Sequence, residues 1–323
     1  LSNLHKDIPK SYLEDFDIIK KKVLPFAKKK KIIFSMHSVF TNDNFKIYIA
    51  ETKKVGSKFI FSGHGKSLLK LDGRFSFFEK TCNKIIRWDN PKQIKRDNIE
   101  QNKDIYVSLS PSLPNIKLKY SKTGDSCSIL TYEQPRYAWQ IGQFPSAKQS
   151  IDFFNELMHF VDKLNPEIRS KVKFRIKGNN YGLNYEKKCS EIFGEKKIDK
   201  YSANNPFSKT LLNSKLIIST YPQTVFAEAM NANVPTILII KKNQWLFSKT
   251  ALDTLEVLRQ NHIAFYNFDE ARNHINKYWK DLSVWWNTEN VQSARKIYLL
   301  NFFNVKANWY KEWSDFIYSS KQL

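Results

Sequence analysis

The stretch SKLIISTYPQTVFAEAMNANVPTILII, from Ser214 to Ile240, decides the fold class of this chain. An apolar run at 215–220 leads into a turn at Pro222, a helical pattern occupies 223–233, and a second apolar run follows at 234–240. This order predicts one βαβ crossover, which is right-handed in nearly all proteins. The helix is expected to begin at the carboxyl end of the first strand, where open α/β sheets bind their ligands.

The same alternation of short β-rich runs and amphipathic stretches continues through the rest of the chain and predicts mostly parallel sheets. Strands are expected at 31–36, 58–62, 83–88, 104–109, 127–132, 171–177 and 263–268. Helices are expected at 42–55, 147–164 and 208–214, with an aromatic-rich helical tail that runs to about Ser319. The pattern indicates an α/β protein with the later part of one Rossmann-like unit, a complete second unit, and C-terminal helices.

A polar segment at 117–126 separates the two series of strands and is interpreted as a linker. We therefore predict a first domain over 1–122, a second domain over 123–286, and a helical tail over 287–323 that packs back on the domains. At 323 residues, with 41% apolar residues, the chain can bury cores for two medium domains.

Lysine accounts for most of the formal net charge of +22, with dense runs at 20–22 and 28–31. Such a charge suits a phosphate-bearing substrate, the anionic surface of a membrane, or nucleic acid. No RNA-recognition, zinc-finger or homeodomain signature accompanies the lysines, so dedicated nucleic acid binding is not expected. We expect an anionic donor and a peripheral contact with an anionic inner membrane.

The cysteines and the absence of long apolar runs indicate the compartment. Cys82, Cys127 and Cys189 are far apart and lack metal-ligand spacing, so neither a disulfide scaffold nor a zinc site is predicted. No run reaches the roughly 18 apolar residues of a membrane span, and no cleavable leader is recognisable. A reducing, cytoplasmic location is expected, without a metal or another cofactor.

Thr220, Thr224 and Glu228 lie around the start of the central helix. The free N–H groups and the positive dipole end of a helix form an anion site, and threonine hydroxyls there either cap the helix or bind a phosphate. Glu228 lies one turn beyond Thr224 on the same face, where its carboxylate is well placed to accept hydrogen bonds from ribose hydroxyls. The alternative is that the threonines are ordinary caps and Glu228 is a solvated acid.

The stretch KFIFSGHGKSLLK, Lys58 to Lys70, places His64 between Gly63 and Gly65 directly after an expected strand. It is not a Walker-type phosphate loop, because that loop needs a glycine where Ile60 stands. The two glycines leave room for a ligand beside the imidazole, but a simple turn with an incidental histidine would have the same sequence. His159 and His274 fall within helical patterns and are interpreted as partly buried structural residues.

These segments resemble a family of bacterial transferases of surface-carbohydrate biosynthesis, whose fold is similar to the two-Rossmann-domain glycosyltransferases called GT-B. The matching stretches are IPKSYLEDF (8–16), HSVFTNDNFKIYIAE (37–51), GHG (63–65), LLNSKLIISTYPQTVFAEAMNANVPTILI (211–239) and HIAFYNFDEARNHINKYWKDLSVWW (262–286). The likeness covers most of the chain and is strongest from 211 to 286. The His64-Gly65 pair followed by a lysine also resembles a stretch of teichoic-acid glycerophosphotransferases in which the histidine is thought to be catalytic. Family members carry a longer N-terminal part, so the first unit is expected to be incomplete here.

The resemblance implies a role for each matching residue. His64 would be the catalytic base, with Gly63, Gly65 and Lys66 on the acceptor side. The donor would be bound by Arg175, Thr220, Gln223, Thr224 and Glu228. The sequence departs from the family at three places: the family commonly has glutamine at Gly63, glycine at Lys66 and an asparagine-serine pair at Pro222-Gln223.

The expected function is transfer of a sugar, or a polyol-phosphate unit, from a CMP-, CDP- or UDP-linked donor to a glycan or lipid-linked glycan. His64 would take the proton of the acceptor hydroxyl in an inverting reaction that needs no metal. Two alternatives remain open at this point: a sugar-nucleotide epimerase or hydrolase of the same fold, and a non-catalytic module that binds nucleotide or glycan.

Overall fold

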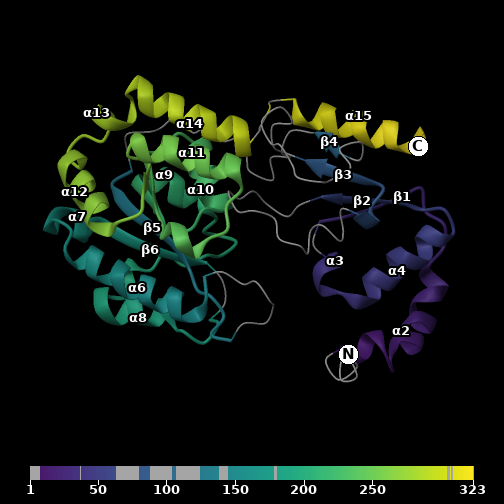
Figure 1. The fold of residues 1–323 in the computed structure, drawn as a ribbon. Helices are drawn as coiled ribbons and strands as arrows, with labels where there is room; N and C mark the ends of the chain where they lie inside the picture. The colour runs from purple at the N-terminus through teal and green to yellow at the C-terminus, as the bar shows by residue number, and fades with distance from the viewer. Residues whose placement is uncertain are drawn as a thin grey trace.

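A computed structural model describes residues 8–36, 38–62, 80–87, 104–106, 124–137, 145–177, 180–303, 306 and 308–322. These residues form two parallel β-sheets in separate lobes, each accompanied by helices (Figure 1). The prediction of an α/β protein with two parallel-sheet units is therefore confirmed. Residues 107–123, which contain the predicted boundary between the first two domains, lie outside the described part.

The first sheet has four parallel strands in the order β1-β2-β3-β4. Their bounds are Ile32–Ser35, Lys58–Ser62, Lys84–Arg87 and Asp104–Tyr106. Helix α4 (Asp43–Lys54) connects β1 to β2, and the Asn42 side chain accepts a hydrogen bond from the Phe45 backbone N–H at its start. Short helices precede and accompany it: η1 (Lys10–Tyr12), α2 (Phe16–Val23), η2 (Leu24–Phe26) and α3 (Ser38–Thr41).

Apolar side chains on one face of the first sheet form a small core with α3 and α4. The core consists of Ile33, Val39, Ile49, Phe59, Phe61, Cys82 and Ile85. Ile60 and Ile86 belong instead to a second cluster that includes Phe316 from the C-terminal helix. Alternate residues of these strands thus serve the two faces, as the period of two in a strand requires.

The second sheet has five parallel strands in the order β6-β5-β7-β8-β9. Their bounds, in chain order from β5, are Ser126–Tyr132, Val172–Lys177, Ser214–Ser219, Thr236–Ile239 and Ala264–Phe265. The strand order reverses between β5 and β7, which makes the carboxyl ends of these two strands a topological switch point. Doubly wound sheets bind their ligands in the crevice at such a point.

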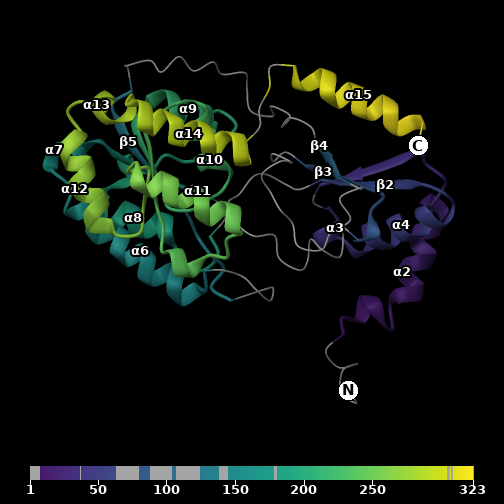
Figure 2. The ribbon, with the colours of Figure 1, turned by 45° about the horizontal axis from the view of Figure 1, so that its top comes forward.

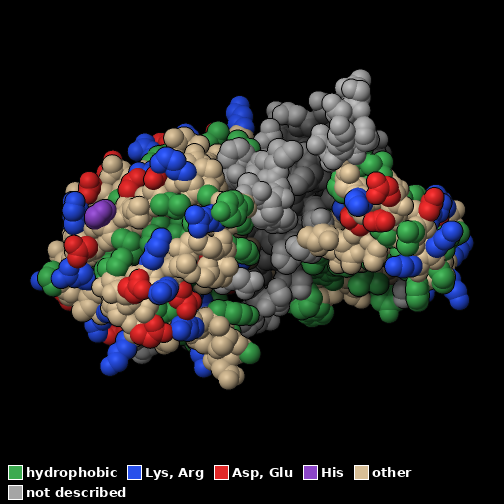
Figure 3. Space-filling view, turned by 90° about the horizontal axis from the view of Figure 1, so that it is seen from below, with side chains coloured by type: hydrophobic (Ala, Val, Ile, Leu, Met, Phe, Trp, Pro, Cys, Tyr) green, Lys and Arg blue, Asp and Glu red, His purple; other side chains and the backbone are tan. Residues whose placement is uncertain are grey.

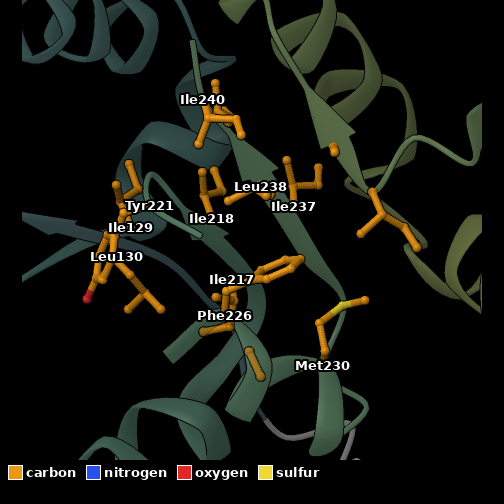
Figure 4. Packing of buried hydrophobic residues seen from close by; sticks show 14 of the residues in the cluster. Ile129, Leu130, Ile217, Ile218, Tyr221, Phe226, Met230, Ile237, Leu238 and Ile240 are labelled. Carbon is orange, nitrogen blue, oxygen red and sulfur yellow. The ribbon is translucent and has the colours of Figure 1, made fainter. Parts of the chain in front are cut away.

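The central crossover predicted from the sequence is present as β7, α10 (Thr224–Asn231) and β8. Phe226 and Met230 on the inner face of α10 are fully buried and pack toward the isoleucines of β7 and β8 (Figure 4). The other helices and 3-10 turns of this unit surround the sheet. They are α6 (Ala147–Asp162), α7 (Pro166–Lys171), α8 (Tyr185–Phe193), η4 (Glu195–Lys197), α9 (Phe207–Asn213), η5 (Lys242–Gln244), α11 (Lys249–Gln260), α12 (Phe268–Tyr278) and α13 (Ser283–Trp286).

The C-terminal helices α14 (Glu289–Phe302) and α15 (Trp309–Gln322) pack on different lobes (Figure 2). Tyr298 of α14 contacts Phe226 of α10 with ring centroids 5.0 Å apart. In α15, the Trp313 ring lies edge-on to Phe34 of β1, at a centroid distance of 6.1 Å. Among the described residues, no helix combines the length and apolar character needed to cross a membrane.

Candidate functional site

Residues 219–224 link β7 to α10 at the switch point and are tied to β5 by hydrogen bonds. The backbone N–H and the hydroxyl of Thr220 both donate to the Leu130 carbonyl, at 2.9 and 3.1 Å. The Ser219 hydroxyl donates to the Tyr221 carbonyl at 2.9 Å. The Thr220 hydroxyl proton is thus used within the sheet, and this threonine fixes the position from which α10 begins.

Helix α10 differs from α6, α11 and α12, which also follow strands of this sheet, in how its first turn is capped. The starts of α6, α11 and α12 are capped by the side chains of Ser146, Ser248 and Asn267. At α10 the N-cap residue is Gln223, and its side chain makes no capping hydrogen bond. Because a helix N-terminus attracts anions, the start of α10 is the candidate anion site of this sheet.

Glu228 lies one turn inside α10 and is half-buried. Within the described part of the chain, no hydrogen bond or ion pair engages its carboxylate. Burial raises the pKa of this carboxyl to about 7, from an ordinary value of 4.5. A half-buried carboxylate that receives no hydrogen bond lowers the stability of the folded protein.

We expect this carboxylate to make the stability of the protein depend on pH. Between pH 4.5 and 7 the unfolded chain releases a proton that Glu228 of the folded protein retains, so a rising pH favours unfolding. Relative to Glu228→Gln, the wild type should lose on the order of 2 kcal/mol of unfolding free energy over this range. Denaturant titrations of both proteins at pH 4.5, 6 and 7.5 measure the difference. Parallel pH profiles would contradict this account.

Glu228 and Arg175 both influence the pKa of the Tyr221 phenol. Burial raises the pKa of the Tyr221 phenol, the Glu228 carboxylate raises it further, and the Arg175 guanidinium opposes this rise. Tyr221 also packs on Tyr132 of β5, with ring centroids 4.7 Å apart. The switch point therefore has a buried phenol whose pKa is influenced both by an acid of α10 and by a cation of β6.

Arg175 itself is buried in a polar network at the carboxyl end of β6. Its Nη1 donates to Asp199 Oδ2 at 3.1 Å and its Nη2 to the Asn205 carbonyl at 2.9 Å. The guanidinium also lies over the rings of Tyr201 and Phe207, at 5.5 and 5.9 Å. This network holds the loop after residue 198 in place. That Arg175 binds the diphosphate of a donor stays a prediction.

Glu133 is a polar residue of this edge that the sequence reasoning did not single out. It directly follows β5 and is 5% exposed. Its Oε1 accepts hydrogen bonds from the N–H groups of Tyr181, Leu183 and Asn184 at 2.7–3.2 Å, and its Oε2 from that of Tyr185 at 3.0 Å. Glu133 thus occupies the N-terminus of α8. Its position immediately after a buried strand was the sequence signal that could have identified Glu133 as a residue of this edge.

Other predicted positions are placed differently or lie outside the described residues. Gly63, His64, Gly65 and Lys66 are outside them, so their roles stay predictions. His274 is buried, and burial lowers its pKa to about 3. His159 is exposed, so the expectation of partial burial was wrong: it lies on the outer face of α6, whose inner face is formed by Leu157, Phe160 and Val161.

No group of three or more His, Cys, Asp or Glu side chains suited to a metal ion occurs in the described part of the chain. Whether the reaction proceeds without a metal or another cofactor stays a prediction.

Several solved structures share this two-lobed arrangement. The crystal structure of Anabaena Alr3699/HepE in complex with UDP and glucose matches with a TM-score of 0.51 and 11% identity, over 94% of this chain and 82% of that one. The pneumococcal O-GlcNAc transferase GtfA in complex with UDP and GlcNAc matches with a TM-score of 0.52 and 11% identity, over 94% and 59%. An S. aureus TarM mutant in complex with Fondaparinux, alpha-GlcNAc-glycerol and UDP matches with a TM-score of 0.50 and 14% identity, over 92% and 57%. At these identities the likeness shows the fold alone, which is GT-B.

No curated protein sequence matches the chain. A family described as LIC12162 family transferase matches residues 1–317. This match confirms the resemblance to a transferase family on which the sequence interpretation rests. The chain, with its GT-B fold, belongs to the LIC12162 family of transferases.

Proposed function

We propose that this transferase moves a sugar, or a polyol-phosphate unit, from a nucleotide-activated donor to a surface glycan, and that α10 binds the nucleotide. The observation that carries the proposal is the start of α10 at the switch point, without a side-chain cap and with the half-buried carboxylate of Glu228 one turn away. Such a site combines donors for an anion with an acceptor for hydroxyls. A nucleoside diphosphate presents both groups.

In this proposal, the phosphate or diphosphate of the donor lies at the N-terminus of α10, near Gln223 and Thr224, where N–H groups and the helix dipole stabilise its charge. Glu228 accepts hydrogen bonds from the ribose hydroxyls. Thr220 positions the segment through Leu130, and Arg175 contributes positive charge from β6. CMP-, CDP- and UDP-linked donors are the candidate class, and UDP ranks first because HepE, GtfA and TarM were solved with it.

The chemistry proposed for the first lobe is general base catalysis by His64. The imidazole takes the proton of an acceptor hydroxyl. In polyol-phosphate transfer, the oxygen of that hydroxyl attacks the phosphorus of the transferred unit and the bond from this phosphorus to the nucleotide breaks. In sugar transfer, the oxygen attacks the anomeric carbon. The bond from this carbon to the donor phosphate breaks, and its electron pair leaves with the nucleotide. Gly63, Gly65 and Lys66 border the acceptor, and attack from the face opposite the leaving group inverts the configuration.

The acceptor class proposed here is a glycan or lipid-linked glycan of the bacterial surface, and the protein would work at the cytoplasmic side of the inner membrane. An epimerase or hydrolase of the same fold would convert or hydrolyse the sugar nucleotide without any acceptor. Product analysis with and without acceptor separates these reactions. A non-catalytic module would bind the nucleotide and give no product in either case.

We expect Glu228→Ala to weaken nucleotide binding about 10- to 100-fold, because hydrogen bonds to a charged group contribute roughly 1.5–3 kcal/mol. Isothermal calorimetry with UDP, CDP, CMP, GDP and ADP measures the dissociation constants. Glu191→Ala is the matched control, since Glu191 is exposed on α8 and should leave binding unchanged. Equal affinity of the wild type and Glu228→Ala for every nucleotide would overturn the assignment of the donor site.

A further inference from the structure

The N-terminal part of the first lobe has a surface that the transfer reaction does not explain. Residues 18–31, IIKKKVLPFAKKKK, contain seven lysines and no acidic residue. Three large apolar side chains among them are exposed: Ile18 at 53%, Leu24 at 45% and Phe26 at 71%. We call residues 18–31 the lysine-apolar surface. In Figure 3, hydrophobic and Lys or Arg side chains lie side by side on the outer part of the right-hand lobe.

The lysine-apolar surface is held in place from its inner side. Val23 of α2 is buried, and Lys20 points toward Glu51 of α4 at 3.9 Å. The Lys30 backbone N–H donates to the Ser57 hydroxyl at 2.9 Å. These contacts turn the other face of α2 and η2 outward, with Ile18, Lys21 and Lys22 close together at helical spacing.

Its composition favours an anionic lipid surface over nucleic acid. Aliphatic side chains such as Ile18 and Leu24 gain nothing from a phosphate backbone, which is recognised by cations and hydrogen-bond donors. At a bilayer, apolar side chains enter the boundary between headgroups and acyl chains, while lysines along the same segment reach the lipid phosphates. Each lysine near such a surface contributes about 1 kcal/mol.

We propose that the lysine-apolar surface docks the protein on an anionic membrane, with Phe26 and Leu24 inserted at the headgroup level and the exposed lysines of 21–31 on lipid phosphates. The benefit of docking depends on the proposed function, because docking would bring the enzyme to a lipid-linked acceptor. Its physical basis is independent of the donor site. Docking should therefore persist in Glu228→Ala, and nucleotide binding should persist when docking is lost.

The first test is co-sedimentation with vesicles of phosphatidylcholine that contain either 0 or about 30% phosphatidylglycerol. We expect the wild type to bind only the anionic vesicles, less tightly as salt rises. The double variant Phe26→Ser with Lys29→Glu should bind at least about tenfold more weakly. Ile192→Ser with Lys196→Glu is the matched control, because it changes an exposed apolar residue and an exposed lysine of the second lobe and should bind as the wild type does.

A second measurement reports insertion directly. Phe26→Cys can be labelled selectively with the environment-sensitive dye NBD, because Cys82, Cys127 and Cys189 are buried. We expect its emission to rise with anionic vesicles and to stay constant with neutral ones. The proposal is overturned if the wild type does not bind anionic vesicles, if the double variant binds them as well as the control does, or if a generic DNA duplex binds the surface and the vesicles do not.

Discussion

Replacing His64 with alanine is expected to lower the turnover number of transfer by about 10²–10⁴-fold, because a positioned general base contributes on this scale. The loss should fall on the chemical step. The donor nucleotide is proposed to bind to α10 of the second lobe, so its dissociation constant should stay unchanged. Steady-state kinetics with a sugar nucleotide and an acceptor, together with calorimetry of UDP binding, separate the two effects.

His159→Ala is the matched control for His64→Ala, since His159 is exposed on α6 and should leave turnover unchanged. The pH dependence gives a second readout. In the wild type, kcat at saturating donor should fall below pH ~6.5 as the imidazole becomes protonated. His64→Ala should lose this limb of the profile. A variant with wild-type turnover and an unaltered pH profile would remove His64 from the mechanism.

The crossover at 214–240 could be predicted from sequence because its signals are local. Two runs of buried β-branched residues flank a helix whose inner face repeats at the period of 3.6, and Pro222 marks the turn between them. Helices α8 and α11 were not predicted. Both are amphipathic, and α8 is capped at its start by an acid 52 residues earlier in the chain, which no local pattern can reveal.

The candidate site was predictable in its location but not in its contacts. The spacing of Thr224 and Glu228 on one helix face placed both correctly on α10. The partners of Thr220 and Arg175 could not be predicted, because Leu130 and Asp199 reach them through strand pairing and a loop. A sequence shows that a residue has a side chain suited to a ligand. Only the folded structure shows whether that side chain already forms hydrogen bonds with other groups of the protein.

Glu133→Ala is expected to have the largest effect on stability, about 3–5 kcal/mol, because it leaves four backbone N–H groups at the start of α8 without their acceptor. Two of these groups, the N–H groups of Leu183 and Tyr185, have little access to water, since both residues are almost fully buried. Glu133→Gln should cost less, because the amide oxygen still accepts hydrogen bonds although the charge that favours the helix dipole is lost.

Denaturant unfolding of the wild type, Glu133→Ala and Glu133→Gln measures these losses. Glu186→Ala is the control: Glu186 lies in the first turn of the same helix, is exposed, and pairs with Lys200 at 3.6 Å. An exposed ion pair of this kind contributes only about 0–1 kcal/mol. If Glu133→Ala and Glu186→Ala cost the same, Glu133 would not be the anchor of α8. A much larger loss for Glu133→Ala would show that this buried carboxylate, and not the exposed ion pair of Glu186, stabilises the start of α8.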